Sequence, residues 1–154
     1  KLYIGEETFM PCTPKSVVTI LNSLNINLEG MNVVVIGRSN IVGKPVGALL
    51  LKENCTVTMC HSKTKNLREV CKRSDILVVA IGKAKFIDDS FVKEGAIVID
   101  VGTNSVQGKI TGDVDFDKVI DKASFVTPVP GGVGALTTTL LMKNACEAIE
   151  KYED

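Results

Sequence analysis

The stretch 32-NVVVIGRSNIVGKP-45 decides the fold of this chain. A run of β-branched residues stops at Gly37, a short polar turn follows, and a helical pattern begins near Val42. A strand that ends in a glycine turn and leads into a helix is typical of nucleotide-binding proteins. Gly37 and Gly43 are present, but Ser39 stands where the usual G-x-G-x-x-G fingerprint has its middle glycine. The stretch predicts a variant nucleotide pocket, with an ordinary strand-to-helix loop as the alternative.

Strands and helices are expected to alternate along the rest of the chain. Apolar runs predict buried parallel strands at residues 32–36, 56–60, 76–81, 96–101 and 125–126. Helical spacing predicts helices from Thr13, the expected N-cap, to about residue 25, then at 42–50, 67–71, 115–120 and 136–150, with one turn at 88–92. The pattern predicts an α/β fold, a Rossmann-like doubly wound parallel sheet with helices on both faces.

Four polar or glycine-containing turns are expected to share one edge of this sheet. Right-handed crossovers bring the carboxyl ends of parallel strands to the same edge, and ligands bind outside that edge. The turns are residues 37–39, 61–64, 81–83 and 101–104. In the first turn, Gly37 permits close backbone approach, the amides of the next helix can hold a phosphate, and Arg38 can add a bidentate charge.

The composition limits the class of protein. With 154 residues, 45% of them apolar, the chain is expected to form one packed domain over residues 1–154. Its 18 basic and 18 acidic residues cancel, so no nucleic-acid partner is expected. No apolar run approaches the length of a membrane span, and the polar start lacks the apolar region of a signal peptide. We therefore expect a cytoplasmic protein with no membrane partner.

No metal site is expected from the cysteines or from the acidic residues. The 5 cysteines include no C-x-x-C pair, which argues against a zinc site or a disulfide framework and favours reduced, apolar side chains. Asp113, Asp115 and Asp117 alternate with apolar residues but lack the glycine and the distant glutamate of a calcium loop. We interpret them as the solvated start of a helix, where acids favour the helix dipole.

The second turn indicates which dinucleotide would bind. A dinucleotide fold usually places there the acid that holds the ribose 2′-hydroxyl, but residues 60–64 contain no carboxylate. Ser62 and the neighbouring cations suit a 2′-phosphate, which favours NADP over NAD; the alternative is a solvated polar loop. His61 is the only histidine, and a structural role is favoured over that of a general base because no nucleophile motif accompanies it.

The segment 127-TPVPGGVGALT-137 cannot form a regular element because of its prolines and glycines. Its low polarity favours a shaped loop that leads into a helix over a plain surface connector.

Together these motifs resemble the C-terminal nucleotide-binding domain of the methylenetetrahydrofolate dehydrogenase/cyclohydrolase family. The resemblance runs nearly from end to end. The matching segments are 11-PCTP-14, 37-GRSNIVGKP-45, 60-CHSKT-64, 93-KEGAIVIDVG-102, 112-GDV-114 and 127-TPVPGGVG-134.

The resemblance implies oxidation of 5,10-methylenetetrahydrofolate with NADP⁺ and hydrolysis of the methenyl product to 10-formyltetrahydrofolate. It implies that the cofactor is held by Gly37, Arg38, Ser39, Ser62 and Thr103. The folate-side wall would come from Pro130, Gly131, Gly132, Val133 and Gly134. It also implies three partners, which are tetrahydrofolate derivatives, a second copy of the chain in a homodimer, and an N-terminal substrate domain. Residues 1–13 and 136–154 would pack toward that domain.

Two departures from the family pattern stand out. Ala135 and Leu136 replace the family's Pro and Met, and residues 1–10 cannot supply the substrate domain with its catalytic Lys. Neither Tyr3 nor Tyr152 lies in that domain's motif. No catalytic residue is therefore expected in this chain, which alone should bind NADP weakly and show no turnover. A stand-alone NADP-sensing module and a dehydrogenase of the shikimate or amino-acid type are the alternatives, and the Pro-Gly-Gly-Val-Gly loop argues against the latter. A structural scaffold is least favoured, because it needs no ligand-type turns.

Overall fold

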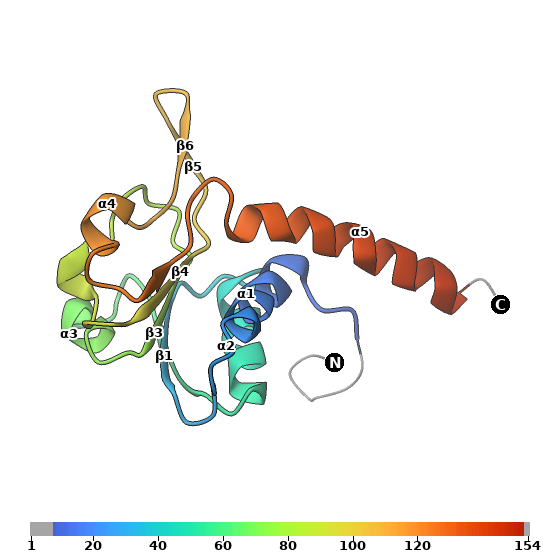
Figure 1. Ribbon diagram of the computed structural model, residues 1–154, viewed down its shortest axis with the longest axis horizontal. Coiled ribbons are helices and arrows are strands. Elements are labelled where there is room, and N and C mark those ends of the chain that lie inside the picture. The colour runs from blue at the N-terminus through green and yellow to red at the C-terminus, as the bar shows by residue number, and fades with distance from the viewer. Residues whose placement is uncertain (1–7, 153–154) are drawn as a thin grey trace.

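A twisted parallel sheet forms the centre of the computed structural model, which describes residues 8–152 (Figure 1). Its strand order is β2-β1-β3-β4-β7, and every neighbouring pair is parallel. The strands are β1 (Asn32–Ile36), β2 (Thr56–Cys60), β3 (Ile76–Val79), β4 (Ile97–Asp100) and β7 (Phe125–Val126). The predicted doubly wound α/β fold is confirmed, although β3 and β4 are shorter than expected.

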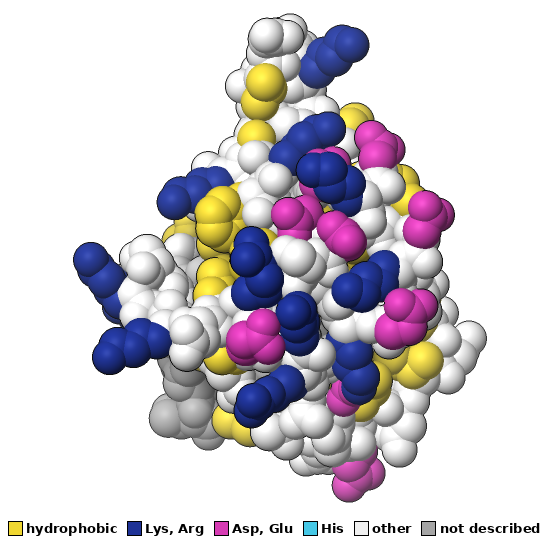
Figure 2. Space-filling view, turned by 90° about the vertical axis from the view of Figure 1, so that its left-hand side faces the viewer, with side chains coloured by type: hydrophobic (Ala, Val, Ile, Leu, Met, Phe, Trp, Pro, Cys, Tyr) yellow, Lys and Arg dark blue, Asp and Glu magenta, His cyan; other side chains and the backbone are white. Residues whose placement is uncertain are grey.

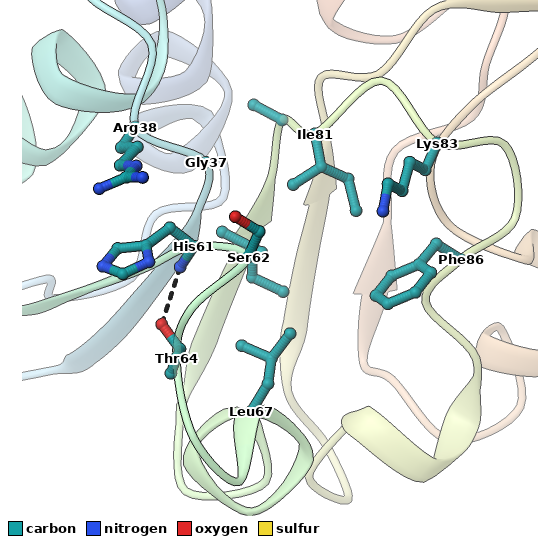
Figure 3. Close-up of a pocket in the computed structure, with 11 residues that line it drawn as sticks. Gly37, Arg38, His61, Ser62, Thr64, Leu67, Ile81, Lys83 and Phe86 are labelled. Carbon is teal, nitrogen blue, oxygen red and sulfur yellow. Dashed lines mark hydrogen bonds between the residues drawn. The ribbon is translucent and has the colours of Figure 1, made fainter.

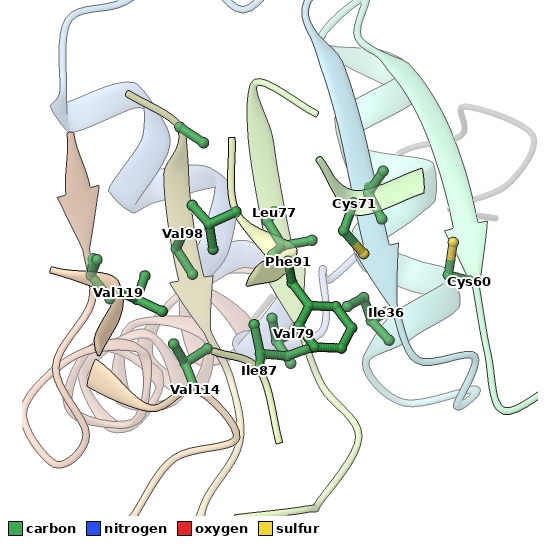
Figure 4. Packing of buried hydrophobic residues seen from close by; sticks show 14 residues of the cluster. Ile36, Cys60, Cys71, Leu77, Val79, Ile87, Phe91, Val98, Val114 and Val119 are labelled. Atoms are coloured by element: carbon green, nitrogen blue, oxygen red, sulfur yellow. The ribbon is translucent and has the colours of Figure 1, made fainter. Parts of the chain in front are cut away.

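The two faces of the sheet pack against different helices because side chains alternate along each strand. Val33 and Val35 face a cluster that includes residues of α1 (Cys12–Ser23) and α2 (Gly43–Lys52). Val34 and Ile36 face the opposite cluster, shown in Figure 4. This second cluster includes residues of α3 (Leu67–Cys71), the short 3₁₀ helix η2 (Asp89–Phe91) and α4 (Phe116–Val119).

The first helix begins earlier than predicted. Pro11, not Thr13, is the N-cap, and its carbonyl oxygen accepts the first helical hydrogen bond from the Lys15 amide at 3.0 Å. Pro14 still lies in the first turn, where its missing N–H removes no helical bond. The last helix, α5 (Val133–Tyr152), also starts before its predicted position and extends away from the sheet (Figure 1).

A β-hairpin was not anticipated from the sequence. Strands β5 (Asn104–Val106) and β6 (Lys109–Thr111) pair antiparallel and project from the body of the molecule (Figure 1). Gln107 and Gly108 join them with positive φ angles of 51° and 76°, the geometry of a type I′ turn. A two-residue turn ending in Gly was the signal for this hairpin.

Basic and acidic side chains are mixed on the face that carries α3 and α4 (Figure 2). Some of them pair, as Lys72 does with Glu69 and Lys118 with Asp115. No helix within residues 8–152 is long and apolar enough to cross a membrane.

Candidate functional site

A pocket of about 370 Å³ opens at the carboxyl ends of β1, β2 and β3. The chain passes from β1 to β2 on one side and reaches β3 on the other, so the pocket lies at the point where the strand order reverses. Open α/β sheets bind their ligands at this point. The lining residues are Ile36, Gly37, Arg38, His61, Ser62, Thr64, Leu67, Ala80, Ile81, Lys83 and Phe86.

The turn that follows β1 requires glycine at two positions. Gly37 has a φ of 127°, and a Cβ there would overlap the carbonyl oxygen of Ala80, the residue that follows β3. A Cβ on Gly43 would overlap the carbonyl oxygen of Gly37. Gly37 thus lets the ends of β1 and β3 meet, and Gly43 lets α2 pack closely on the turn.

Ser39, which stands where the fingerprint has its middle glycine, forms hydrogen bonds that shape the turn. Its Oγ accepts hydrogen bonds from the Val42 and Gly43 amides at 3.1 and 3.2 Å. These two amides at the start of α2 therefore already have a partner within the chain. Ser39 is exposed and does not line the pocket.

The second turn is held in shape by its own polar groups. The His61 amide donates to Thr64 Oγ1 at 2.9 Å, and the Lys63 amide donates to His61 Nδ1 at 3.1 Å. Because Nδ1 accepts, a neutral His61 carries its proton on Nε2. The imidazole thus has a structural bond, in line with the role favoured from the sequence.

The charges around the pocket favour an anionic ligand. Arg38 and His61 lie on one side, Lys83 and Phe86 on the other, and Ser62 between them (Figure 3). The lining residues include two cations and no carboxylate. Cationic and hydroxyl donors that line an open cleft attract phosphate groups.

Two buried carboxylates lie behind the third turn, and one of them corrects the interpretation of the acidic segment. Asp113 is fully buried and accepts hydrogen bonds from the amides of Ile81 and its two successors, so it is not a solvated acid at a helix start. The position of Asp115 before α4 and of Asp117 in its first turn does agree with that interpretation. Asp100 is also buried, and burial raises its pKa to about 6. The nearby Asp113 carboxylate acts in the same direction, whereas hydrogen bonds from three backbone amides lower the pKa.

The remaining predicted site residues lie outside this pocket. Thr103 is exposed after β4, and residues 130–134 lead into α5. The preceding residues Thr127, Pro128 and Val129 line a separate cavity of about 270 Å³. Thr127 Oγ1 accepts a hydrogen bond from the Asp100 amide at 2.8 Å, which ties the loop to β4. The structure thus brings together Gly37, Arg38 and Ser62 of the predicted cofactor residues.

Sequence reasoning missed three residues of this region. Leu67 and Phe86 line the pocket from α3 and from the segment before η2, and Asp113 supports its third turn from behind. No local pattern marks Leu67 or Phe86, because each is one apolar residue among many. Asp113 lies among other polar and charged residues, so no local pattern marks it as a buried acid.

Comparison with known proteins shows the family of the chain. Residues 11–153 match the family described as tetrahydrofolate dehydrogenase/cyclohydrolase, NAD(P)-binding domain. The chain belongs to this family. All 154 residues align with the bifunctional protein FolD of Clostridium botulinum (strain Alaska E43 / Type E3) at 74% identity, covering 55% of that protein.

Solved structures show the same domain. The bifunctional FolD enzyme of Campylobacter jejuni superimposes with a TM-score of 0.94 at 45% identity, over 97% of this chain and 54% of the other. FolD of Trypanosoma brucei, solved with NADP cofactor and an inhibitor, gives 0.90 at 38% identity over 97% and 54% of the two chains. This NAD(P)-binding domain spans about half the length of the relatives it matches.

Proposed function

We propose that the pocket binds NADP and that the chain is the cofactor half of an enzyme acting on folate. This enzyme would oxidise 5,10-methylenetetrahydrofolate with NADP⁺ and hydrolyse the methenyl product to 10-formyltetrahydrofolate. The observation that carries the proposal is the pocket at the strand-order reversal, lined by Arg38, Ser62 and Lys83 and free of carboxylates. A dinucleotide pocket specific for NAD would place an acid at the end of β2.

Each residue of the site has a distinct role in this proposal. Arg38 and Ser62 bind the 2′-phosphate, and Gly37 lets the backbone approach the cofactor. Ser39 contributes indirectly, because it holds the start of α2 in place. Thr103 would lie toward the nicotinamide half of a bound cofactor, and the chemistry that the nicotinamide would supply is hydride acceptance.

The folate side is proposed to use residues 130–134, with the rest of the substrate site outside this chain. Hydride transfer needs the donor and acceptor to be held together, and ring opening needs a positioned proton-transfer group. We assign neither role to a residue of this chain. Alone, it should therefore bind NADP without turnover.

Calorimetry with the chain itself tests this function. NADP⁺ should bind more tightly than NAD⁺, and mixing with 5,10-methylenetetrahydrofolate should yield no NADPH. Failure to bind either dinucleotide would contradict the proposed pocket. Binding that is tight, together with no stimulation by a separately expressed substrate domain, would favour the stand-alone sensing module.

The proposed contact with a substrate domain uses the two ends of the chain. Segments 1–13 and 136–154 would pack toward it, although residues 1–7 and 153–154 lie outside the described part. In this region Asn144 Nδ2 donates to the Met10 carbonyl oxygen at 3.2 Å. The side chains of Leu141 and Met142 on α5 are largely exposed and offer an apolar contact surface.

A homodimer is proposed through the edge of the sheet at β2. This strand has one neighbour only, and Met59 on β2 and Leu51 on α2 expose apolar side chains beside it. Edge strands with exposed apolar residues commonly pair with a second chain.

A cytoplasmic location is proposed as well, and the five free cysteines support it.

A further inference from the structure

The turn after β3 binds a carboxylate of the chain itself. The amides of Ile81 and Gly82 donate to Asp113 Oδ2 at 2.7 and 2.9 Å, and the Lys83 amide donates to Oδ1 at 2.8 Å. Successive amides that converge in this way form a concave site for an anion. Here the anion is internal, so these three amides are not available to a ligand phosphate.

The same carboxylate also holds the base of the β5–β6 hairpin. Asn104, the first residue of β5, donates from Nδ2 to Asp113 Oδ1 at 2.9 Å. Asp113 therefore has four hydrogen-bond donors from two separate segments. A buried charge requires this degree of compensation, because burial without partners is costly.

The backbone around Asp113 is built to accept this arrangement. Asp100 accepts hydrogen bonds from the amides of Asp113 and Val114 at 3.1 and 2.9 Å. A Cβ on Gly102 would overlap the Asp113 carboxylate, and a Cβ on Gly112 would overlap that of Asp100. The two glycines leave the space that the two acids occupy.

The turn held by Asp113 forms one wall of the pocket. Ile81 and Lys83 both line it, and the Lys83 ammonium lies 5.4 Å from the ring centroid of Phe86. Figure 3 shows Lys83 and Phe86 across the pocket from Arg38. The direction in which Lys83 leaves the backbone is set by amides that Asp113 fixes.

We propose that Asp113 is a positioning residue of the cofactor pocket, acting through Lys83. Its carboxylate holds the turn at residues 81–83 so that the Lys83 ammonium supplies the second positive charge, opposite Arg38, to the phosphates of the dinucleotide. This inference rests on the proposed binding of NADP, and it adds a residue that does not itself touch the cofactor.

A double-mutant cycle tests the inference. Asp113→Asn and Lys83→Gln should each weaken NADP⁺ binding by about tenfold, measured by calorimetry on the chain. The double variant should bind no more weakly than Asp113→Asn alone, because a displaced Lys83 has nothing further to lose. Asp121→Asn, an exposed acid of the same segment, is the matched control and should bind as the wild type does. Losses that multiply would contradict the action through Lys83.

Amide hydrogen exchange separates this inference from the proposed function. In Asp113→Asn the amides of residues 81–83 should exchange faster while those of β1 stay protected. If the wild type does not bind NADP⁺, the proposed function fails, and unchanged exchange at 81–83 would overturn the role of Asp113 independently. If binding in Asp113→Asn equals that of the wild type, the inference fails and the proposed function stands.

A milder variant covers the case in which Asp113→Asn does not fold. Asn104→Ala removes one of the four donors and leaves the charge in place. It should weaken NADP⁺ binding by two- to fivefold and speed exchange at residues 81–83. Wild-type values for both measurements in this variant would overturn the inference.

Discussion

The pocket at the end of β1 and the loop that leads into α5 differ in how completely this chain builds them. Three turns from neighbouring strands enclose the pocket, and hydrogen bonds within the chain fix two of them. The loop at residues 130–134 offers one wall, and beyond it α5 exposes 60% of Leu141 and 68% of Met142. Under the proposed function, the chain thus supplies most of the cofactor pocket and one side of the folate site, as expected if cofactor and substrate are held by different domains.

Two glycines, one in each region, give the largest expected difference. Gly37→Ala should lower the free energy of unfolding by about 3–4 kcal/mol, because the methyl group overlaps Ala80 and the residue has a φ of 127°. Gly134→Ala meets no neighbour and should stabilise the helix by about 0.5 kcal/mol. Urea unfolding monitored by circular dichroism gives both values. Equal destabilisation by the two substitutions would contradict the difference between the regions.

The buried carboxylate of Asp100 at the end of β4 should make stability depend on pH. The pKa of Asp100 is raised from 3.8 to about 6, chiefly by burial, so the folded state holds this proton more tightly than the unfolded chain. The free energy of unfolding should therefore fall as pH rises from about 4 to about 6, by on the order of 3 kcal/mol, and then level off. The lowered pKa values of Asp75 and Asp88 act in the opposite direction, below about pH 4.

The matched experiment uses Asp100→Asn. Denaturant unfolding between pH 4 and pH 7 should show a flat profile in this variant, since the titrating group is gone. A profile with the same slope as the wild type would assign the pH dependence to another group.

Removing the proposed 2′-phosphate contacts should change the choice of cofactor. Arg38→Gln combined with Ser62→Ala should cost about 1.5–3 kcal/mol of NADP⁺ binding and leave NAD⁺ binding nearly unchanged. Calorimetry with both dinucleotides measures the ratio. Lys109→Gln, an exposed cation on β6 outside the pocket lining, serves as the control. An unchanged preference for NADP⁺ would place the discriminating contact elsewhere.

The smallest effect is expected on the exposed face of α5. Leu141→Ser should change the stability of this chain by less than about 0.5 kcal/mol, whereas Leu140→Ala, at a buried neighbour, should cost about 2–4 kcal/mol. Thermal unfolding compares the two. The same Leu141→Ser change should weaken association with a separately expressed substrate domain, and unaltered association would argue against this face as the contact.

The sheet, and the edge at which its polar turns gather, could be predicted from the sequence because both depend on local patterns of residues. The β-branched run ending at Gly37 and the polar turn after Cys60 are readable from residue type and spacing alone. Asp113 was misinterpreted because its burial depends on segments some thirty residues away in the chain. The role of Ser39 at the cofactor stays a prediction, and the structure adds that its hydroxyl accepts hydrogen bonds from amides at the start of α2. Contacts between distant segments leave no periodic mark in the sequence.

The partners of Asp113 also have a consequence for the order of folding. This residue lies 30 to 32 positions after the amides it binds, and β4 and the β5–β6 hairpin come between them. These contacts cannot form until residue 113 is present and the intervening chain has closed its loop. During synthesis on a ribosome, β1, β2 and β3 emerge well before residue 113 does. The turn at residues 81–83 therefore gains the support of Asp113 only after the hairpin has been made, and a nascent chain that ends before residue 113 is expected to hold the three strands without this support.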